Sequence, residues 1–404
     1  MENRKIILAF SGGLDTTYCA VYLKKQGYEV YGVLVNTGGF DAEEVSRITA
    51  HASKLGLAGF ECLDVTKQYY DKVIRYLVYG NVLKNNTYPL SVSAERIVQA
   101  VAVAEYARKT GAVAVAHGST GAGNDQVRFD MVFAAIIPDV AVVTPIRDLK
   151  LTREDEIIFL KEHGVEMNFE KAQYSINKGL WGTSVGGKET LTSHQYLPES
   201  AFPTPITKTG TEKLELAFEK GELTTVNGQT YAHPSEAIQA VEAIAAPFGI
   251  GRDIHVGDTI IGIKGRVGFE AAGALVIIKA HHLLEKHTLT KWQLYWKDQL
   301  SQWYGNWLHE GQYLDPVMRN LEVFLKDTQK TVSGKVFIEL SPEKYKLTGI
   351  ESVHDLMQAK FGSYGEMNNA WSGEDVKGFS KIFGNQNALY QQVNGNFADT
   401  FTGN

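Results

Sequence analysis

The chain has 404 residues and carries 40 Lys and Arg against 46 Asp and Glu, a formal net charge of −6. At roughly 100–200 residues per domain, this length predicts two or three domains. With 44% hydrophobic and 21% charged residues, the composition excludes bulk disorder. The mild acidity argues against a protein dedicated to duplex DNA or to a membrane surface, which would need an excess of Lys and Arg. Anionic small ligands stay open, because backbone amides and helix N-termini bind them without net positive charge.

The two cysteines, Cys19 and Cys62, exclude a disulfide framework and a multi-cysteine zinc site and favour a reducing compartment. We expect Cys19 to be a small buried packing residue rather than a nucleophile. The first apolar run, residues 6–10, is too short for the core of a signal peptide. No stretch approaches the ~20 apolar residues of a membrane-spanning helix. The sequence therefore predicts a cytoplasmic protein without a membrane segment.

The first part of the chain alternates short apolar runs with longer amphipathic segments, a pattern typical of βαβ units around a parallel sheet. Strands are expected at residues 6–10, 29–36, 60–65, 112–117 and 141–144. Helices are expected at residues 16–26, 41–55, 68–83, 94–109 and 154–163. We therefore predict an α/β fold whose doubly wound parallel sheet forms a nucleotide-binding domain over residues 1–165.

The alternation breaks down after residue 164, where glycines cluster. Expected strands at residues 256–264, 269–270 and 275–279 indicate an α+β synthetase domain over residues 166–360. The polar remainder, residues 361–404, is predicted to be an oligomerisation tail that packs on a neighbouring subunit.

One long helix near the end of the second domain is predicted to carry an apolar stripe. The stripe residues recur at helical spacing and are Trp292, Trp296, Leu300, Trp303 and Trp307. Packing in the core or against another subunit is favoured over a platform for nucleobases, because aromatic stripes on helices usually serve burial.

The loop after the first strand, Ser11-Gly12-Gly13-Leu14-Asp15-Thr16-Thr17, has the composition of a phosphate cradle. Paired glycines permit positive φ and let backbone N–H groups converge on an anion at the start of a helix. Hydroxyls add donors, and Asp15 offers a carboxylate for a divalent cation on the phosphates. The loop lacks the Lys of GxxxxGK(S/T) and the spacing of GxGxxG. SGGxD instead matches the PP-loop of enzymes that cleave ATP between the α- and β-phosphates, and we prefer this interpretation to a bare strand-to-helix turn.

A second polar segment, residues 117–129, follows the fourth strand. Ligands bind outside the carboxyl ends of strands in open α/β sheets, so this segment and the SGGLD loop should face one crevice. Thr120, Asn124, Asp125 and Arg128 combine donors, an acceptor and a cation, which suits an amino-acid substrate. The alternative is that Asn124 and Asp125 only cap the next helix.

Four segments in this order resemble the argininosuccinate synthase family over about residues 5–280. They are SGGLDT, HGSTGAGNDQVRF at 117–129, YSIN with LWG and Ser184 at 174–184, and GIGR at 249–252. The resemblance implies arginine biosynthesis, in which the ureido oxygen of citrulline attacks the α-phosphate of ATP with Mg²⁺. Pyrophosphate leaves, and the amine of aspartate then displaces AMP from the citrullyl-adenylate to give argininosuccinate. It also implies a homotetramer that binds small molecules and no nucleic acid or membrane.

The resemblance implies the residues of each subsite. ATP would bind Ala9, Phe10, Ser11, Gly12, Gly13, Leu14, Asp15, Thr16, Thr17, Thr37 and Gly118. Aspartate would bind Thr120, Asn124 and Asp125. Citrulline would bind Tyr88, Ser93, Asn124, Arg128, Ser175 and Ser184. Asp15, Asp125 and Arg128 are the expected catalytic residues, acting by positioning and charge stabilisation, with Arg128 able to hold a carboxylate in a bidentate fork. No resident metal site is expected.

The chain departs from the family at the substrate. Ser91-Val92-Ser93 stands where the family usually has Gly-Thr-Ser, and Asn177-Lys178-Gly179 where it has Asp-Glu-Asn. A Glu and a Tyr that line the family's citrulline site are Gly257 and Phe269 here. Either neighbouring carboxylates, with Asp258 and Glu270 as candidates, replace the lost charge, or the substrate is a citrulline with an acylated α-amino group. We favour the same substrate with a rearranged loop.

Two other classes of protein share either the SGGxD loop or its expected ligand, ATP. Enzymes of the PP-loop class that modify tRNA need a basic surface and often a reactive cysteine pair, which the charge and the separated cysteines disfavour. A non-enzymatic ATP sensor would not need the GNDQVR segment. His281, His282 and His287 lack metal-ligand spacing and are expected at the surface or in packing. Lys264 and Arg266 are expected to flank a solvated hairpin turn at Gly265.

Overall fold

The structure, a computed structural model, describes residues 4–165, 167, 174–359, 364–365 and 370–395. Contacts within the chain divide it into two units, Met1–His354 and Asp355–Asn404. Among the described residues, no helix is both long enough and apolar enough to cross a membrane.

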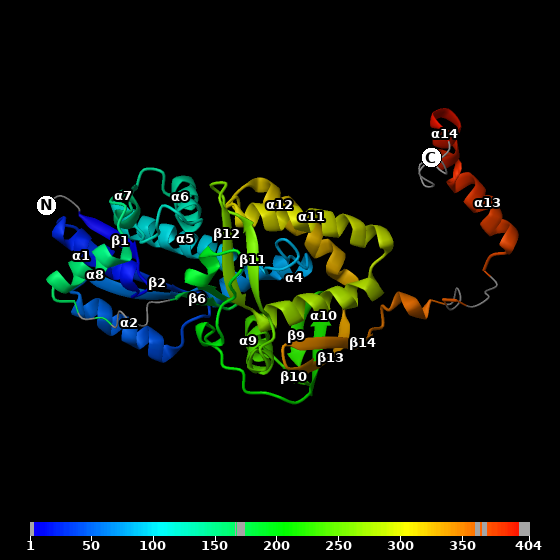
Figure 1. Ribbon diagram of the computed structural model, residues 1–404, viewed down its shortest axis with the longest axis horizontal. Helices are drawn as coiled ribbons and strands as arrows, with labels where there is room; N and C mark the ends of the chain where they lie inside the picture. The colour runs from blue at the N-terminus through cyan, green and yellow to red at the C-terminus, as the bar shows by residue number, and fades with distance from the viewer. Residues whose placement is uncertain (1–3, 166, 168–173, 360–363, 366–369, 396–404) are drawn as a thin grey trace. The chain divides into compact units, whose positions relative to one another are not determined.

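The first unit begins with a five-stranded, fully parallel sheet (Figure 1). Its order is β3-β2-β1-β4-β5, so the chain proceeds outward on both sides of β1, as expected for a doubly wound sheet. The strands are β1 (Lys5–Ala9), β2 (Glu29–Asn36), β3 (Gly59–Asp64), β4 (Ala114–Ala116) and β5 (Ala141–Val143). The predicted α/β class and all five strand positions are confirmed within a few residues.

Helices cover both faces of this sheet because alternate strand residues point to opposite sides. Ile6 and Leu8 of β1 belong to one apolar cluster, with residues of α1, α2 and α8, whereas Ile7 belongs to another, with residues of α5 and α6. These helices are α1 (Leu14–Lys25), α2 (Ala42–Lys54), α5 (Ser91–Thr110), α6 (Asp125–Ile136) and α8 (Arg153–Glu162), and a short α7 (Pro145–Asp148) precedes α8. Cys19 lies in the first cluster and is fully buried, as predicted.

The helix expected at residues 68–83 is a composite. It consists of α3 (Thr66–Tyr69), a π-helical turn at Tyr70–Ile74 and α4 (Arg75–Tyr79). The chain then leaves the helix at Gly80, and Asn81 has a φ of 48°, so residues 80–83 are not helical. The predicted end was therefore wrong.

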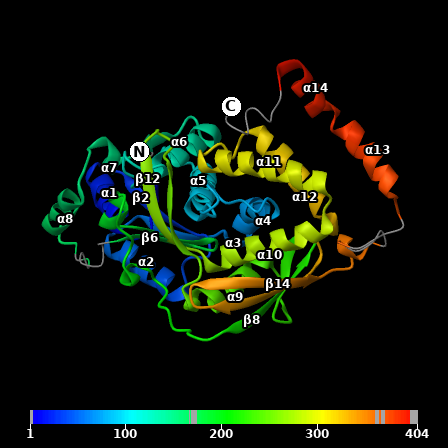
Figure 2. The same cartoon turned by 45° about the vertical axis from the view of Figure 1, so that its right-hand side comes forward.

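The described residues of the rest of the first unit form two antiparallel sheets, four α-helices and a few short 3-10 turns, an α+β arrangement. One sheet has the order β11-β12-β7-β6, with β6 (Ser175–Gly179), β7 (Gly182–Gly186), β11 (Arg252–Asp258) and β12 (Lys264–Glu270). The other has the order β10-β9-β8-β13-β14, with β8 (Glu212–Glu219), β9 (Glu222–Val226), β10 (Gln229–Thr230), β13 (Gly334–Ser341) and β14 (Lys344–Glu351). The helices are α9 (Pro234–Ala245), α10 (Ala272–Thr288), α11 (Lys291–His309) and α12 (Pro316–Thr328). Figure 2 shows α10 lying over the second of these sheets.

Three sequence predictions in this region were wrong. Residues 275–279 lie inside α10 and not in a strand; a short apolar run that is buried has no periodicity to tell the two apart. Residues 256–264, which were expected to form one strand, instead comprise the end of β11, the turn that follows it and the first residue of β12. Gly265 is paired with Gly257 within the β11–β12 ladder and is not in the turn.

The helix expected around the tryptophan stripe is confirmed as α11, but core burial of the stripe is not. Trp292, Trp296 and Trp303 are 63%, 54% and 56% exposed. Packing of these side chains against another subunit stays a prediction. Of the three histidines, His281 is fully buried and hydrogen-bonded to Asn81 and Gln329, in agreement with a packing role.

The second unit contains α13 (Gly373–Phe383) and α14 (Asn385–Asn394). Phe379 and Phe383 stack on one another and are exposed within this unit. The predicted tail, residues 361–404, lies partly outside the described residues, and its packing on a neighbouring subunit stays a prediction.

Candidate functional site

The loop after β1 has the backbone of an anion cradle. Gly12 has a φ of +75°, which favours glycine, and the extended Gly13 precedes the first turn of α1. The hydroxyls of Ser11 and Thr16 lie 3.4 Å apart at an exposed position. The hydroxyl of the buried Thr17 instead contacts His51 Nε2 at 3.0 Å. Ser11 and Thr16 are therefore the hydroxyls available to a ligand at this loop.

The loop after β4 touches the loop after β1 at Gly118. A Cβ placed on Gly118 would lie 3.1 Å from Asp15 Cβ and 3.3 Å from Thr16 N. The two strands are neighbours in the sheet, and their following helices lie on opposite faces, so this contact marks the point where ligands bind in open α/β sheets. The structure thus brings together the two loops that the sequence predicted to share a crevice.

Gly118→Ala is expected to raise the KM for ATP about tenfold. The new methyl group would press on backbone atoms of the first loop, and such overpacking costs about 1–3 kcal/mol. Steady-state kinetics with varied ATP measures the effect. Gly123→Ala is the matched control, because no atom lies within 4 Å of its added Cβ. Equal KM values for both variants would contradict the contact between the loops.

Thr37 follows β2 at the same edge of the sheet. Its carbonyl oxygen accepts a hydrogen bond from Leu180 N at 3.1 Å, and its hydroxyl donates to Glu95 Oε1 at 2.9 Å. The buried Glu95 also accepts from Gln99 Nε2 at 2.8 Å. Thr37, which was predicted to bind ATP, is therefore fixed by a buried carboxyl group that sequence reasoning missed.

A chain of three charged side chains lies beside the crevice. Asp125 accepts from Arg96 Nε at 2.9 Å and from Arg128 Nη1 at 3.0 Å. Burial alone would raise the pKa of Asp125, but the two guanidinium groups outweigh it and hold that pKa below its usual range. Asp125 is therefore an anion that orients two cations, of which Arg128 is buried.

The side chain of Asn124 makes no capping hydrogen bond to α6. This disagrees with the alternative interpretation, in which Asn124 serves only as a helix cap. Its Oδ1 accepts a hydrogen bond from Ile260 N at 2.8 Å, in the turn between β11 and β12. Thr120 lies in the exposed part of the loop. The loop after β4 thus holds the β11–β12 turn through Asn124, and Thr120 stays accessible.

Arg128 is buried, and most of its donors already have partners. Nη2 lies 2.9 Å from Ser93 Oγ, and both Nε and Nη2 donate to the carbonyl oxygen of His309, at 3.0 and 2.8 Å. The fork that was expected to hold a substrate carboxylate is thus closed on protein acceptors. His309 belongs to this site although it is far from Arg128 in sequence, and no motif could have identified it.

Tyr88 is buried next to this cluster. Its hydroxyl contacts Ser91 Oγ at 3.1 Å and accepts from Val92 N at 3.0 Å. Its ring packs on His255 and Phe269, with centroid distances of 5.2 and 5.3 Å. Phe269 therefore serves as an apolar wall, and His255 is a third site residue, after Glu95 and His309, that sequence reasoning missed.

Ser184 joins the cluster through Asn177, and Ser175 does not. Ser184 Oγ accepts from Asn177 Nδ2 at 3.3 Å, and Asn177 Oδ1 accepts from Arg96 Nη2. Ser184 is buried, whereas Ser175 is exposed at the start of β6. The structure therefore connects one of the two predicted serines to the charged cluster.

The two carboxylates proposed as replacements for the lost family Glu have other partners, so the structure does not favour that hypothesis. Asp258 is exposed and pairs with Lys264 Nζ at 2.6 Å. Glu270 is buried on the face opposite Phe269, where it accepts from Thr204 Oγ1 at 2.8 Å. Successive residues of β12 point to opposite faces, so only one of the pair can reach the pocket.

The first loop also fits a magnesium ion. Asp15 offers a carboxylate, and Mg²⁺ commonly takes one or two carboxylates together with phosphate oxygens. The buried Glu156 lies next to it: burial, the charge of Asp15 and a hydrogen bond with Asp15 raise the pKa of Glu156 to about 8. Within the described residues, no group of three or more His, Cys, Asp or Glu side chains is placed to hold a metal. A cation here would need the phosphates.

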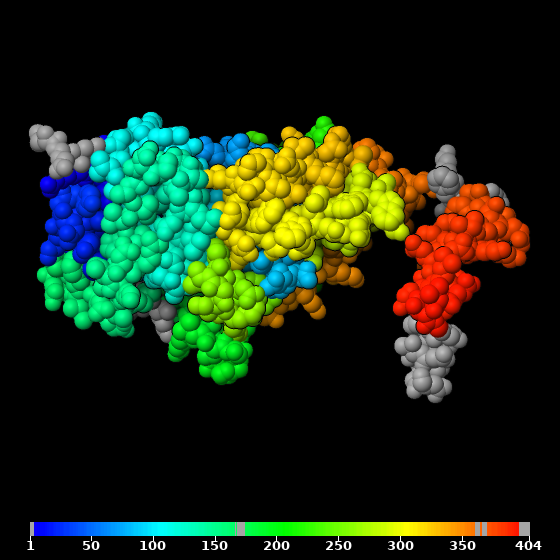
Figure 3. All heavy atoms as spheres, turned by 90° about the horizontal axis from the view of Figure 1, so that it is seen from above, coloured from blue at the N-terminus to red at the C-terminus, as the bar shows by residue number. Residues whose placement is uncertain are grey.

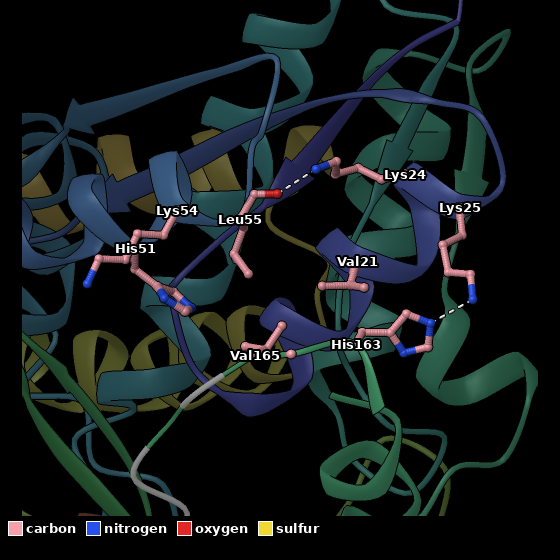
Figure 4. A pocket seen from close by; sticks show the side chains of 9 residues that line it. Val21, Lys24, Lys25, His51, Lys54, Leu55, His163 and Val165 are labelled. Atoms are coloured by element: carbon pink, nitrogen blue, oxygen red, sulfur yellow. Dashed lines mark hydrogen bonds between the residues drawn. The ribbon is translucent and has the colours of Figure 1, made fainter. Parts of the chain in front are cut away.

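A cavity of about 550 Å³ lies away from these loops, at the C-terminal ends of α1 and α2 (Figure 4). Lys24 Nζ donates to Leu55 O at 2.5 Å, and Lys25 Nζ lies 2.6 Å from His163 Nε2. Lysines near helix C-termini interact favourably with the helix dipole, and Lys24 of α1 here binds the carbonyl group of Leu55 at the end of α2. The basic lining of this cavity therefore has a structural explanation, and the loops that meet at Gly118 are the better candidate site.

The fold and the site define a class: an α/β protein with an SGGxD loop at the carboxyl end of a central strand of its parallel sheet, followed by an α+β region. Two family models match the chain, the arginosuccinate synthase N-terminal HUP domain over residues 5–166 and the arginosuccinate synthase C-terminal domain over residues 174–390. The chain belongs to the argininosuccinate synthase family. Membership implies a ligase that uses ATP.

Curated relatives agree along nearly the whole length. The argininosuccinate synthase of Xylella fastidiosa is 35% identical over 98% of this chain and 99% of its own. That of Xanthomonas campestris is 36% identical over 98% of this chain and 100% of its own, and that of Methanocaldococcus jannaschii 34% over 96% and 98%. Bacterial and archaeal relatives are therefore similar to both domains.

Proposed function

We propose that the protein is an AMP-forming C–N ligase that joins citrulline and aspartate into argininosuccinate, in arginine biosynthesis. One observation carries the proposal. The loop after β1 and the loop after β4 meet at Gly118, and the helix that follows the second loop carries Asp125 and Arg128, which are linked to each other and to Arg96 of α5. This arrangement supports the proposal, because a nucleotide phosphate bound at the first loop would lie next to groups that can orient an amino-acid substrate.

The first step forms a bond between the ureido oxygen and the α-phosphorus of ATP, and the bond to the leaving pyrophosphate breaks. In the second step the aspartate amine attacks the ureido carbon, and the carbon–oxygen bond to AMP breaks. The backbone N–H groups of the loop after β1 and the N-terminus of α1 stabilise the charge of the leaving pyrophosphate. Mg²⁺ held with Asp15 would neutralise part of that charge.

No covalent bond to the protein is required, so the side chains act by positioning. We assign ATP to Ala9, Phe10, Ser11, Gly12, Gly13, Leu14, Asp15, Thr16, Thr17, Thr37 and Gly118. We assign aspartate to Thr120, Asn124 and Asp125, and citrulline to Tyr88, Ser93, Asn124, Arg128, Ser175 and Ser184. Of these, Asp15, Asp125 and Arg128 have the catalytic roles.

An assay of AMP and pyrophosphate release tests this function. With ATP, Mg²⁺, aspartate and citrulline, the protein is expected to form one AMP and one pyrophosphate per argininosuccinate, and to form none when aspartate and citrulline are both omitted. Product is followed by mass spectrometry. Pyrophosphate release that does not depend on any ureido acid would contradict the proposal.

A second candidate substrate is a citrulline whose α-amino group is acylated. The observation that favours it is the orientation of the acidic groups: Asp258 pairs with Lys264, Glu270 faces Thr204, and Asp125 is bound by two arginines. An α-ammonium group would thus find no carboxylate without other partners among these three. The assay is therefore run with citrulline and with N-acetylcitrulline in parallel. Efficient turnover of citrulline alone excludes the acylated substrate.

We also propose a cytoplasmic homotetramer with the three-part division 1–165, 166–360 and 361–404. Support comes from the exposed Trp292, Trp296 and Trp303 on α11 and from the free state of both cysteines, as in a reducing compartment.

A further inference from the structure

The end of α11 reaches the charged cluster from the opposite side of the site. Figure 3 shows the surface of α11 and α12 (yellow) adjoining that of α5 and α6 (cyan to green). His309 is the last residue of α11 and is buried. The chain then turns at Gly311, where a Cβ would lie 3.6 Å from Arg128 Cα. The backbone of this turn therefore lies directly against α6.

His309 meets Arg128 with its main chain and its side chain. The carbonyl oxygen accepts from Nε and Nη2, and ring Nδ1 lies 3.3 Å from Nη2. The same Nδ1 lies 3.1 Å from Ser93 Oγ. Ring Nε2 lies 3.4 Å from the carbonyl oxygen of Asp258, at the end of β11. One residue thus connects α5, α6 and the β11–β12 hairpin.

These partners assign the tautomer of the ring. A guanidinium group only donates, so Nδ1 must be an acceptor, and Nε2 then carries the hydrogen and donates to Asp258 O. Burial and the adjacent charge of Arg128 lower the pKa of His309 to about 3. The ring is therefore neutral at physiological pH, and its Nδ1 lone pair stays available to Arg128 and Ser93.

These contacts leave Arg128 with few donors for a ligand. A guanidinium group has five N–H donors. Nε donates to the His309 carbonyl, one N–H of Nη1 to Asp125, and those of Nη2 to the His309 carbonyl and to the Ser93–His309 pair. Within the described part of the chain, the second N–H of Nη1 has no acceptor. It is the one donor that Arg128 can offer without breaking a contact.

We propose that His309 is a positioning residue that fixes the Arg128 guanidinium so that a single N–H of Nη1 is presented to a carboxylate of the ureido substrate. This inference rests on the proposed function and deepens it. It replaces the expected bidentate fork by one directed hydrogen bond. It also makes the end of α11 a wall of the substrate pocket, so the residue at 309 determines which ureido acids are accepted.

Two substitutions separate positioning from mere packing. His309→Phe keeps a ring but removes the acceptor, whereas His309→Asn places an amide oxygen where Nδ1 stood. Because a hydrogen bond to a charged group is lost, His309→Phe is expected to raise the KM for the ureido acid about 10- to 100-fold. The KM for ATP should change less than twofold. In His309→Asn, the KM for the ureido acid should lie within about threefold of the wild-type value. Glu310→Gln, at the adjacent exposed position, is the control.

A second measurement is independent of turnover. The ¹⁵N NMR signals of the Arg128 Nη2–H groups, identified by their loss in Arg128→Lys, should shift and exchange faster with water in His309→Phe but not in His309→Asn, because Nη2 is the atom that contacts ring Nδ1. An unchanged signal and unchanged KM values in His309→Phe would overturn the proposal, as would equal increases in the KM for ATP and for the ureido acid. If the wild type forms no AMP with any ureido acid, the proposed function fails, and the NMR signal still decides whether His309 holds Arg128.

Discussion

Lys297→Met is expected to lower the free energy of unfolding by about 3–5 kcal/mol, the usual cost of leaving one partner of a buried ion pair without the other. Lys297 on α11 is fully buried, and its Nζ lies 2.9 Å from Glu285 Oε2 on α10 and donates to Tyr79 O at 3.2 Å. Methionine fills a similar volume but leaves the Glu285 carboxylate uncompensated. Urea denaturation followed by circular dichroism measures the loss.

A second substitution shows whether the unpaired charge of Glu285 causes the loss of stability. Glu285 also accepts from Gln329 Nε2 at 2.9 Å and from Asn81 Nδ2 at 2.5 Å, contacts that a glutamine oxygen can partly retain. The double variant Lys297→Met, Glu285→Gln should therefore recover more than half of the lost stability. Lys286→Met, at an exposed position of α10, should change it by less than about 0.5 kcal/mol. A double variant no more stable than the single one would show that packing, not charge, dominates.

Asp125→Asn is expected to lower kcat/KM by about 10²- to 10³-fold. The amide cannot compensate two guanidinium groups, and its NH₂ group would point a donor at one of them. Arg96 and Arg128 would then lose the orientation that Asp125 Oδ2 and Oδ1 impose at 2.9 and 3.0 Å. The rate of AMP formation at saturating ATP, with varied ureido acid and aspartate, measures the change.

The matched control is Asp139→Asn, an exposed aspartate just after α6, which should stay within twofold of the wild type. Thermal unfolding of Asp125→Asn checks that the loss is one of activity and not of fold. If Asp125→Asn retains more than a tenth of the wild-type kcat/KM while folded, the charged cluster does not orient the substrates.

The sequence by itself determined the fold class of the N-terminal region and the position of its glycine-rich loop. A strand buried on both faces, such as β1, shows an uninterrupted apolar run, and the turn that follows it must contain Gly12 at positive φ. Both signals are local, because they depend on residues adjacent in the chain. The order of alternating strands and helices then fixes a parallel sheet, and the carboxyl ends of its strands locate the crevice.

Only the tertiary structure decided which side chains complete the site. His309 reaches Arg128 across 181 positions of sequence, and Glu95 supports Thr37 across 58. Contacts at such separations leave no periodicity or spacing in the sequence. The same holds for residues 275–279, whose burial on several sides removed the pattern that distinguishes a helix from a strand. Burial and partner choice are properties of the packed whole, so the charge around Arg128 could be assigned only after the elements had been assembled.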